Sequence, residues 1–214
     1  MLISSSELFK SNGSRHLEKF EKKFDKAYGL DEIALVPTKV TVDPKLVDLS
    51  TKLGNMNLKV PIIASAMDSV VDVDTAISLS EHGALGILNL EGVQTRYENP
   101  KEILKKIASV EKDQYVSVMQ DIYKEEVKDE LIIKRIKAIK SKNANTVVSV
   151  TPQNAERIAE IAQEACADAI LVQATVVGAN FETTDQKSKL DLSAFCKKAK
   201  YQYSLEMQPH MKSH

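Results

Sequence analysis

The chain has 214 residues, 43% of them hydrophobic and 28% charged, with a formal net charge of -1. This composition is ordinary for one soluble globular domain or two small ones, and the small net charge argues against nucleic acid as a partner. No apolar run approaches the ~18 residues of a membrane span, so we expect no membrane partner and a cytoplasmic location. Cys166 and Cys196 stand far apart in predicted helices, which favours two inert core residues over a disulfide or a metal site.

The first 29 residues are polar, and Leu17, Phe20 and Phe24 are spaced like one face of a helix, which predicts an N-terminal helical arm over residues 1–29. The next segment, DEIALVPTKVTVDPKLVDLS, combines short apolar runs with two prolines. This pattern favours an extended stretch that lies over a core.

Four apolar runs follow, and each is typical of a strand buried on both faces: KVPIIASAM, ALGILNL, NTVVSV and DAILVQ. Amphipathic helical segments separate them. Their expected boundary residues are Asp72 or Asp74 at the start of DVDTAISLSEHG, Gly83 after its end, Asn99 before Pro100, and Thr151 as the N-cap of the last helix.

One stretch between the second and third strands is ambiguous. YVSVM alone could form a strand, but the apolar residues around it lie on one helical face, and we predict helices over 114–124 and 129–141. Strands that alternate with helices indicate parallel βαβ units, in either an open doubly wound sheet or part of a (β/α)₈ barrel. No G-x-G-x-x-G follows the first strand, which argues against a dinucleotide-binding Rossmann unit.

In both architectures a functional site lies at the C-terminal ends of the strands. Hydroxyls, amides and two carboxylates occur there, a set that suits a polyhydroxy or phosphate-bearing ligand; the candidates are Ser65, Met67, Asp68, Ser69, Asn89, Glu91, Thr151, Gln153, Gln173 and Thr175. Each has a structural alternative. Asp68, Ser69 and Asp72 could cap the next helix, Met67 could fill the core, Asn89 could hold a turn, and Thr151 is more often a cap than a ligand contact.

The same segments carry a family resemblance. AYGLDEIALVP, KVPIIASAMDSVVD, GALGILNLEG and NLEGVQTRYENP resemble the IMP dehydrogenase/GMP reductase family, in particular its shorter IMP dehydrogenase-related branch without CBS domains. The resemblance covers about residues 27–200. It implies an α/β fold that is a partial TIM (β/α)₈ barrel, roughly the first four β/α units.

The resemblance also implies a reaction, the oxidation of IMP to XMP with NAD as hydride acceptor. In the family a loop cysteine attacks the purine C2, the hydride leaves to NAD, and water hydrolyses the thioimidate. Matching positions imply that Ser65, Met67, Asp68 and Asn89 contact the nucleotide. Gln173 and Thr175 fall where longer members present Asp-Ser-Ser to the nicotinamide, which is a departure from their pattern.

The family's cysteine loop, monovalent-cation site and phosphate-binding loops would follow the fourth strand, and this sequence does not contain them. We therefore expect no catalytic residue and no turnover. The alternative function is a non-catalytic nucleotide-binding fragment or a partner of a complete homologue. Exposed barrel edges predict self-association or aggregation.

The last segment, residues 201–214, departs from the family after a predicted barrel region of residues 30–200. No β-branched strand is expected in it. A one-base shift of its reading frame permits a buried strand and a Gly-Asn turn, which favours a frameshift product; an ordinary disordered terminus is the alternative.

Overall fold

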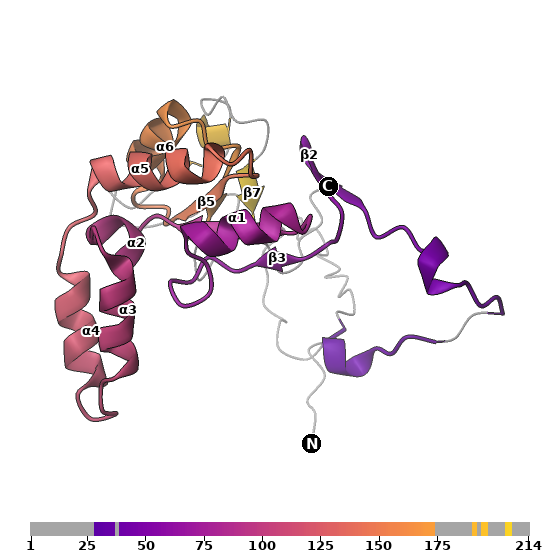
Figure 1. Cartoon of the computed structure of the whole chain (residues 1–214), viewed down its shortest axis with the longest axis horizontal. Helices are drawn as coiled ribbons and strands as arrows, with labels where there is room; N and C mark the ends of the chain where they lie inside the picture. Colours follow the sequence, from indigo (N-terminus) through magenta and orange to yellow (C-terminus); the bar gives the residue numbers. More distant parts are fainter. Residues whose placement is uncertain (1–27, 37–38, 174–189, 192–193, 197–203, 207–214) are drawn as a thin grey trace, which may run out of the picture. The chain divides into compact units, whose positions relative to one another are not determined.

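The structure is a computed structural model that describes residues 28–36, 39–173, 190–191, 194–196 and 204–206 (Figure 1). The chain divides into two compact units, residues 1–47 and 48–214. The first contains two short 3₁₀ turns, η1 (Leu30–Glu32) and η2 (Pro44–Leu46), and its side chains at 31–36 and 39–47 are exposed. The predicted helical arm lies almost wholly outside the described residues, and its boundary at residue 29 stays a prediction.

The second unit contains a sheet of five parallel strands whose spatial order follows the chain order. The strands are β3 (Ile63–Ala64), β4 (Leu85–Asn89), β5 (Val147–Val150), β6 (Ala169–Val172) and β7 (Ser204–Glu206). A doubly wound sheet reverses its strand order at a switch point. This order never reverses, as in the wall of a barrel.

Six helices of the described part connect these strands: α1 (Val73–Glu81), α2 (Val93–Arg96), α3 (Pro100–Ala108), α4 (Tyr115–Tyr123), α5 (Asp129–Lys140) and α6 (Ala155–Glu164). The predicted helices over 114–124 and 129–141 are confirmed as α4 and α5. Local signals set the ends of α1, since Asp72 Oδ1 accepts the Thr75 amide at 2.8 Å and Gly83 adopts φ +80° just beyond the helix. None of the helices in the described ranges is long and apolar enough to cross a membrane.

The sheet separates two apolar clusters, because alternate residues of each strand point to opposite faces. On the outer face, Leu88, Val148 and Ile170 pack against α1, α5 and α6. In α5 the buried residues Ile132, Ile136 and Ile139 lie on one face of the helix. On the inner face, Leu85, Ile87, Val147, Ala169 and Leu171 pack together.

A small antiparallel hairpin, β1 (Thr51–Leu53) and β2 (Met56–Leu58), lies against the inner cluster. Leu58 is 2% exposed, and Leu53 and Met56 pack beside it. The residue after the hairpin is bound to the segment just before β4, since the Lys59 amide donates to the Gly83 carbonyl at 2.8 Å. The hairpin therefore covers the inner face at the N-terminal end of the strands.

One prediction about strands is wrong. The first apolar run is not buried on both faces, because Ile62 and Ile63 of the β3 segment are 58% and 45% exposed; β3 is an edge strand in the described part of the chain. The C-terminal segment contributes a short strand that contains no β-branched residue, since Ser204–Glu206 pairs with Ile170–Val172 as β7. Backbone pairing with a neighbouring strand supplies this order without β-branched residues.

The prediction of inert core cysteines is also wrong, because Cys166 and Cys196 are both exposed. Cys166 follows the end of α6 with φ +69°, a left-handed position that turns the chain toward β6. It therefore lies at the N-terminal end of β6.

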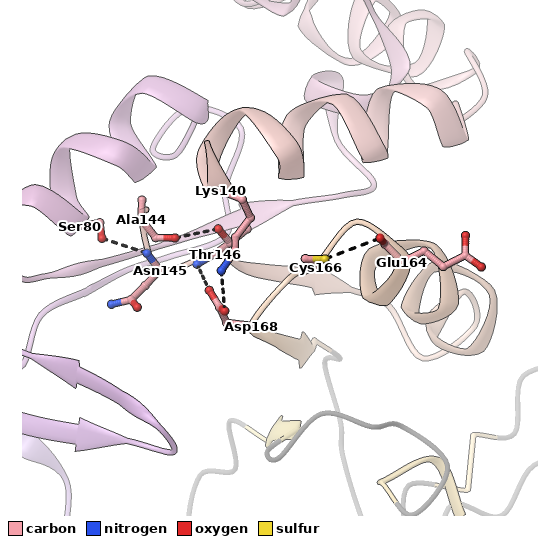
Figure 2. Close-up of polar contacts among 8 residues, drawn as sticks. All are labelled: Ser80, Lys140, Ala144, Asn145, Thr146, Glu164, Cys166 and Asp168. Atoms are coloured by element: carbon pink, nitrogen blue, oxygen red, sulfur yellow. Dashed lines mark hydrogen bonds and ion pairs between the residues drawn. The ribbon is translucent and has the colours of Figure 1, made fainter. Parts of the chain in front are cut away.

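Asp168 joins three elements at that end of the sheet (Figure 2). Its Oδ2 accepts the Thr146 amide at 2.7 Å, its Oδ1 accepts Lys140 Nζ at 2.8 Å, and its own amide donates to the Thr146 carbonyl at 2.8 Å. Nearby, Ser80 Oγ accepts the Asn145 amide at 3.0 Å. These bonds fix the start of β5 beside the start of β6 and the end of α5.

We expect Asp168→Ala to lower the free energy of unfolding by about 1–3 kcal/mol, because the buried Thr146 amide loses its acceptor. Urea denaturation followed by circular dichroism measures this loss. Asp121→Ala is the control, since it removes an ion pair to Lys124 in which both side chains are more than 70% exposed, and it should leave the stability nearly unchanged. Equal losses in the two variants would contradict the role of Asp168.

Candidate functional site

The C-terminal ends of β3 to β6 form one rim, here called the strand rim, because the four strands are parallel and in register. Each of these strands has a polar residue at its end or directly after it. Ser65 follows β3, Asn89 ends β4, Thr151 follows β5 and Gln173 follows β6. Asn89 lies opposite Ser149 in the sheet, one position before the end of β5.

Glu91 connects the ends of β4 and β5. Its carboxylate accepts Thr151 Oγ1 at 3.1 Å and also binds the Thr151 amide and Asn154 Nδ2. The sequence predicts Thr151 as the N-cap of the following helix, and this prediction is wrong. Helix α6 begins at Ala155 with Asn154 as its N-cap, because Glu91 holds Thr151 in the preceding turn.

Asn89 makes a short local contact. Its Oδ1 accepts the Glu91 amide at 3.0 Å, which is an Asx turn of the kind named as the structural alternative. The side chain is half-buried, and within the described residues its Nδ2 group makes no hydrogen bond. This amide nitrogen can donate to a ligand at the strand rim.

Asp68 does not cap α1, since Asp72 does so. Its Oδ2 accepts the Val93 amide at 3.0 Å and the Tyr123 hydroxyl at 2.5 Å. Its Oδ1 is buried and has no hydrogen-bond partner among the described residues. A buried acceptor without a partner costs about 1–3 kcal/mol, so helix capping alone does not account for the position of this carboxylate.

Tyr123 contacts Asp68 directly, and Arg96 packs on the ring of Tyr123. Burial, followed by the hydrogen bond to Asp68 and its negative charge, raises the pKa of the Tyr123 hydroxyl well above its usual range, although Arg96 acts in the opposite direction. The Arg96 guanidinium lies 5.4 Å from the centre of the Tyr123 ring. It also donates to the Glu91 carbonyl at 3.0 Å and to the Tyr123 carbonyl at 3.2 Å.

The remaining predicted residues have no such network. Ser65 is exposed, Met67 is 52% exposed, and Gln173 is exposed after β6. Thr175 lies outside the described residues. β4 and β5 separate β3 from β6 in the sheet, so the predicted nucleotide residues and Gln173 stand on different parts of the strand rim.

The sequence did not indicate Tyr123, Arg96 or the link from Glu91 to Thr151. Tyr123 is 55 residues from Asp68, and Glu91 is 60 residues from Thr151. The only available signal was that Glu91 and Thr151 each follow a strand of the same parallel sheet.

The raised Tyr123 pKa predicts a loss of stability in alkali. The folded chain keeps the proton above pH 10, where an unfolded tyrosine with a pKa of 10.0 releases it, so the free energy of unfolding should fall as pH rises beyond about 10. Tyr123→Phe should reduce this fall. Urea denaturation between pH 8 and about 11 tests it, and parallel curves for the two proteins would show that Tyr123 does not contribute.

Comparison with known proteins identifies relatives of this chain. The sequence model of the IMP dehydrogenase / GMP reductase domain matches residues 27–192. An uncharacterized oxidoreductase of Mycolicibacterium smegmatis is 26% identical over 175 residues, 79% of this chain and 46% of that protein. The inosine-5'-monophosphate dehydrogenase of Methanocaldococcus jannaschii is 42% identical over 64 residues, 30% of this chain and 13% of that protein.

A solved structure confirms the predicted partial TIM barrel. The crystal structure of an IMP dehydrogenase/GMP reductase-like protein from Corynebacterium glutamicum matches with a TM-score of 0.75 at 24% identity, covering 82% of this chain and 47% of that one. The chain thus spans about half the length of the uncharacterized oxidoreductase and of this structure. Because the domain match over residues 27–192 includes most of its 214 residues, the chain belongs to the IMP dehydrogenase/GMP reductase family.

Proposed function

We propose that this chain provides the purine-nucleotide side of an IMP dehydrogenase-like oxidoreductase, with IMP bound at the strand rim next to β3 and β4. One observation carries the proposal. The Ser65–Asp68 turn directly follows β3, which pairs in parallel with β4, and β4 ends in Asn89 within the region that matches the family.

The chemistry of the exposed groups supports this placement. The Ser65 hydroxyl can donate to and accept from a phosphate or ribose oxygen, and the Asn89 Nδ2 group can donate. The Met67 thioether, 52% exposed, offers a polarizable surface to a purine ring. Asp68 is engaged by Val93 and Tyr123, so its proposed role is to hold the turn in place.

NAD is the cofactor that the family implies, and the described residues do not define a site for it. Of the two residues assigned to the nicotinamide side, Gln173 is one exposed amide and Thr175 lies outside the described part. The described residues likewise contain no cluster of metal ligands.

Cys166 does not suit the nucleophilic step of the family reaction. Cys166 precedes β6, at the opposite end of the sheet from Ser65 and Asn89, and a nucleophile must lie within contact distance of the reacting carbon. We therefore propose that the oxidation of IMP to XMP is carried out by longer members of the family and not by these 214 residues alone. The alternative function of these 214 residues is non-catalytic nucleotide binding, and a cytoplasmic location stays part of the proposal.

Isothermal titration of the 214-residue chain with IMP tests the binding site. We expect saturable binding that weakens about tenfold in Asn89→Ala, because one hydrogen bond is lost. Asn57→Ala is the matched control, since Asn57 is exposed on the hairpin at the other end of the strands and should leave the affinity unchanged. Absence of saturable binding to IMP and GMP would refute the proposed site.

An assay for NADH formation from IMP, NAD and water separates the two functions in the same preparation. We expect no turnover by this chain. A measurable rate that disappears in Cys166→Ala or Cys196→Ala would instead make one of these cysteines the nucleophile, and the chain itself would be an enzyme.

A second proposal concerns self-association. Ile62 and Ile63 expose apolar surface beside the edge of β3 that no described strand covers, and edges of this kind pair with other chains. We propose that the β3 edge mediates association, and we expect oligomers in sedimentation experiments that Ile63→Lys dissociates. Val116→Lys, the same type of change on an exposed residue of α4, should have no effect. A monomeric wild-type chain would contradict this proposal.

A further inference from the structure

The helices α3 and α4 form a pair that the sheet does not require. The outer face of the sheet is covered by α1, α5 and α6, whose apolar residues form the outer cluster. In α4 only Ile122 is buried, while Tyr115 and Val116 are 46% and 64% exposed. Figure 1 shows α3 and α4 side by side, beyond α2 and away from the strands.

Two side chains from the segment after β4 bind the C-terminal end of α4. The Tyr97 hydroxyl donates to the Ile122 carbonyl at 2.8 Å, and Arg96 donates to the carbonyls of Tyr123 and Glu125. The Ile122 and Tyr123 carbonyls belong to the last turn of α4, where helices leave such groups unpaired, and Glu125 lies two residues beyond the helix. The end of α4 is thus fixed beside the loop that follows β4.

From this position Tyr123 reaches the turn after β3. Its hydroxyl donates to Asp68 Oδ2 at 2.5 Å, and Asp68 directly follows Met67 and stands three residues after Ser65. Nothing else on α3 or α4 within the described residues forms a hydrogen bond to this turn. The contact joins the helical pair to the residues assigned to the nucleotide.

The Asp68 carboxylate lies directly against Gly92. A Cβ atom on Gly92 would lie 1.9 Å from Asp68 Oδ1 and 2.3 Å from Asp68 Cγ. The Gly92 backbone has φ -95°, which any L-residue can adopt, so the position of Asp68 alone accounts for the need for glycine. Asp68 is therefore held between Gly92, the Val93 amide and Tyr123.

We propose that Tyr123 and Gly92 are positioning residues for the Ser65–Asp68 turn. Through Tyr123 the α3–α4 pair sets the conformation of this turn and so its affinity for the nucleotide. This inference rests on the proposed function. Coupling between two sites is reciprocal, so nucleotide bound at the turn must in turn stabilise the end of α4.

Hydrogen exchange and titration of the full 214-residue chain test the coupling. In Tyr123→Phe, amides of residues 65–70 should exchange faster without ligand. The affinity for IMP should fall about fivefold to tenfold, which lies within the net contribution of one ordinary hydrogen bond. IMP should slow exchange in α4 of the wild-type chain and not in this variant, a change that a merely structural tyrosine would not produce. Gly92→Ala should act in the same direction by displacing the Asp68 carboxylate.

Tyr115→Phe is the matched control, since Tyr115 lies on the same helix, is exposed, and should behave as the wild type in both measurements. If Tyr123→Phe binds IMP as tightly as the wild type and exchanges at the same rate, the inference is overturned and the proposed function stands. If wild type and control both fail to bind IMP and GMP, the proposed function fails, and the inference about affinity fails with it.

Discussion

The parallel register of β4, β5 and β6 is the constraint on which the site depends. Parallel strands bring all their C-terminal ends to one edge, so the polar residues that follow them meet although they are far apart in sequence. The register is fixed at the opposite end, where Asp168 accepts the Thr146 amide at 2.7 Å and Lys140 Nζ at 2.8 Å. The contacts that fix the register and the proposed binding site thus lie at opposite ends of the same strands. This division explains why the exposed Cys166, on the Asp168 side, has no place in the proposed site.

Local patterns in the sequence were sufficient for most of the fold. The apolar runs predicted β4, β5 and β6, and the helical spacing around YVSVM correctly favoured α4 over a strand. The start of α1 was also predictable, since its N-cap Asp72 accepts a hydrogen bond from Thr75, only three residues further along the chain. Thr151 shows the limit of such reasoning. It has the expected N-cap character, but Glu91, 60 residues away, binds it and moves the start of α6 to Ala155.

Burial was predictable only where both neighbours of a strand are present. KVPIIASAM is as apolar as the central strands, and the sequence alone indicates burial on both faces. In the described structure β3 has one neighbour, and Ile63 is 45% exposed. The family match places the chain against about half of a longer relative, and the apolar character of β3 is consistent with an additional neighbour. The exposed residues of β3 therefore reflect the number of strands in this sheet and not a weak strand sequence.

The two carboxylates of the strand rim differ in a way that assigns them different roles. Glu91 has both oxygens engaged by Thr151 and Asn154, so it links β4 to β5 and has little capacity left for a ligand. Asp68 has one oxygen engaged by Val93 and Tyr123 and one buried without a partner in the described chain. An arrangement that leaves a buried acceptor unsatisfied is unfavourable on its own. The two hydrogen bonds to the other oxygen oppose this cost, and they hold the turn that carries Ser65 and Met67 in one conformation.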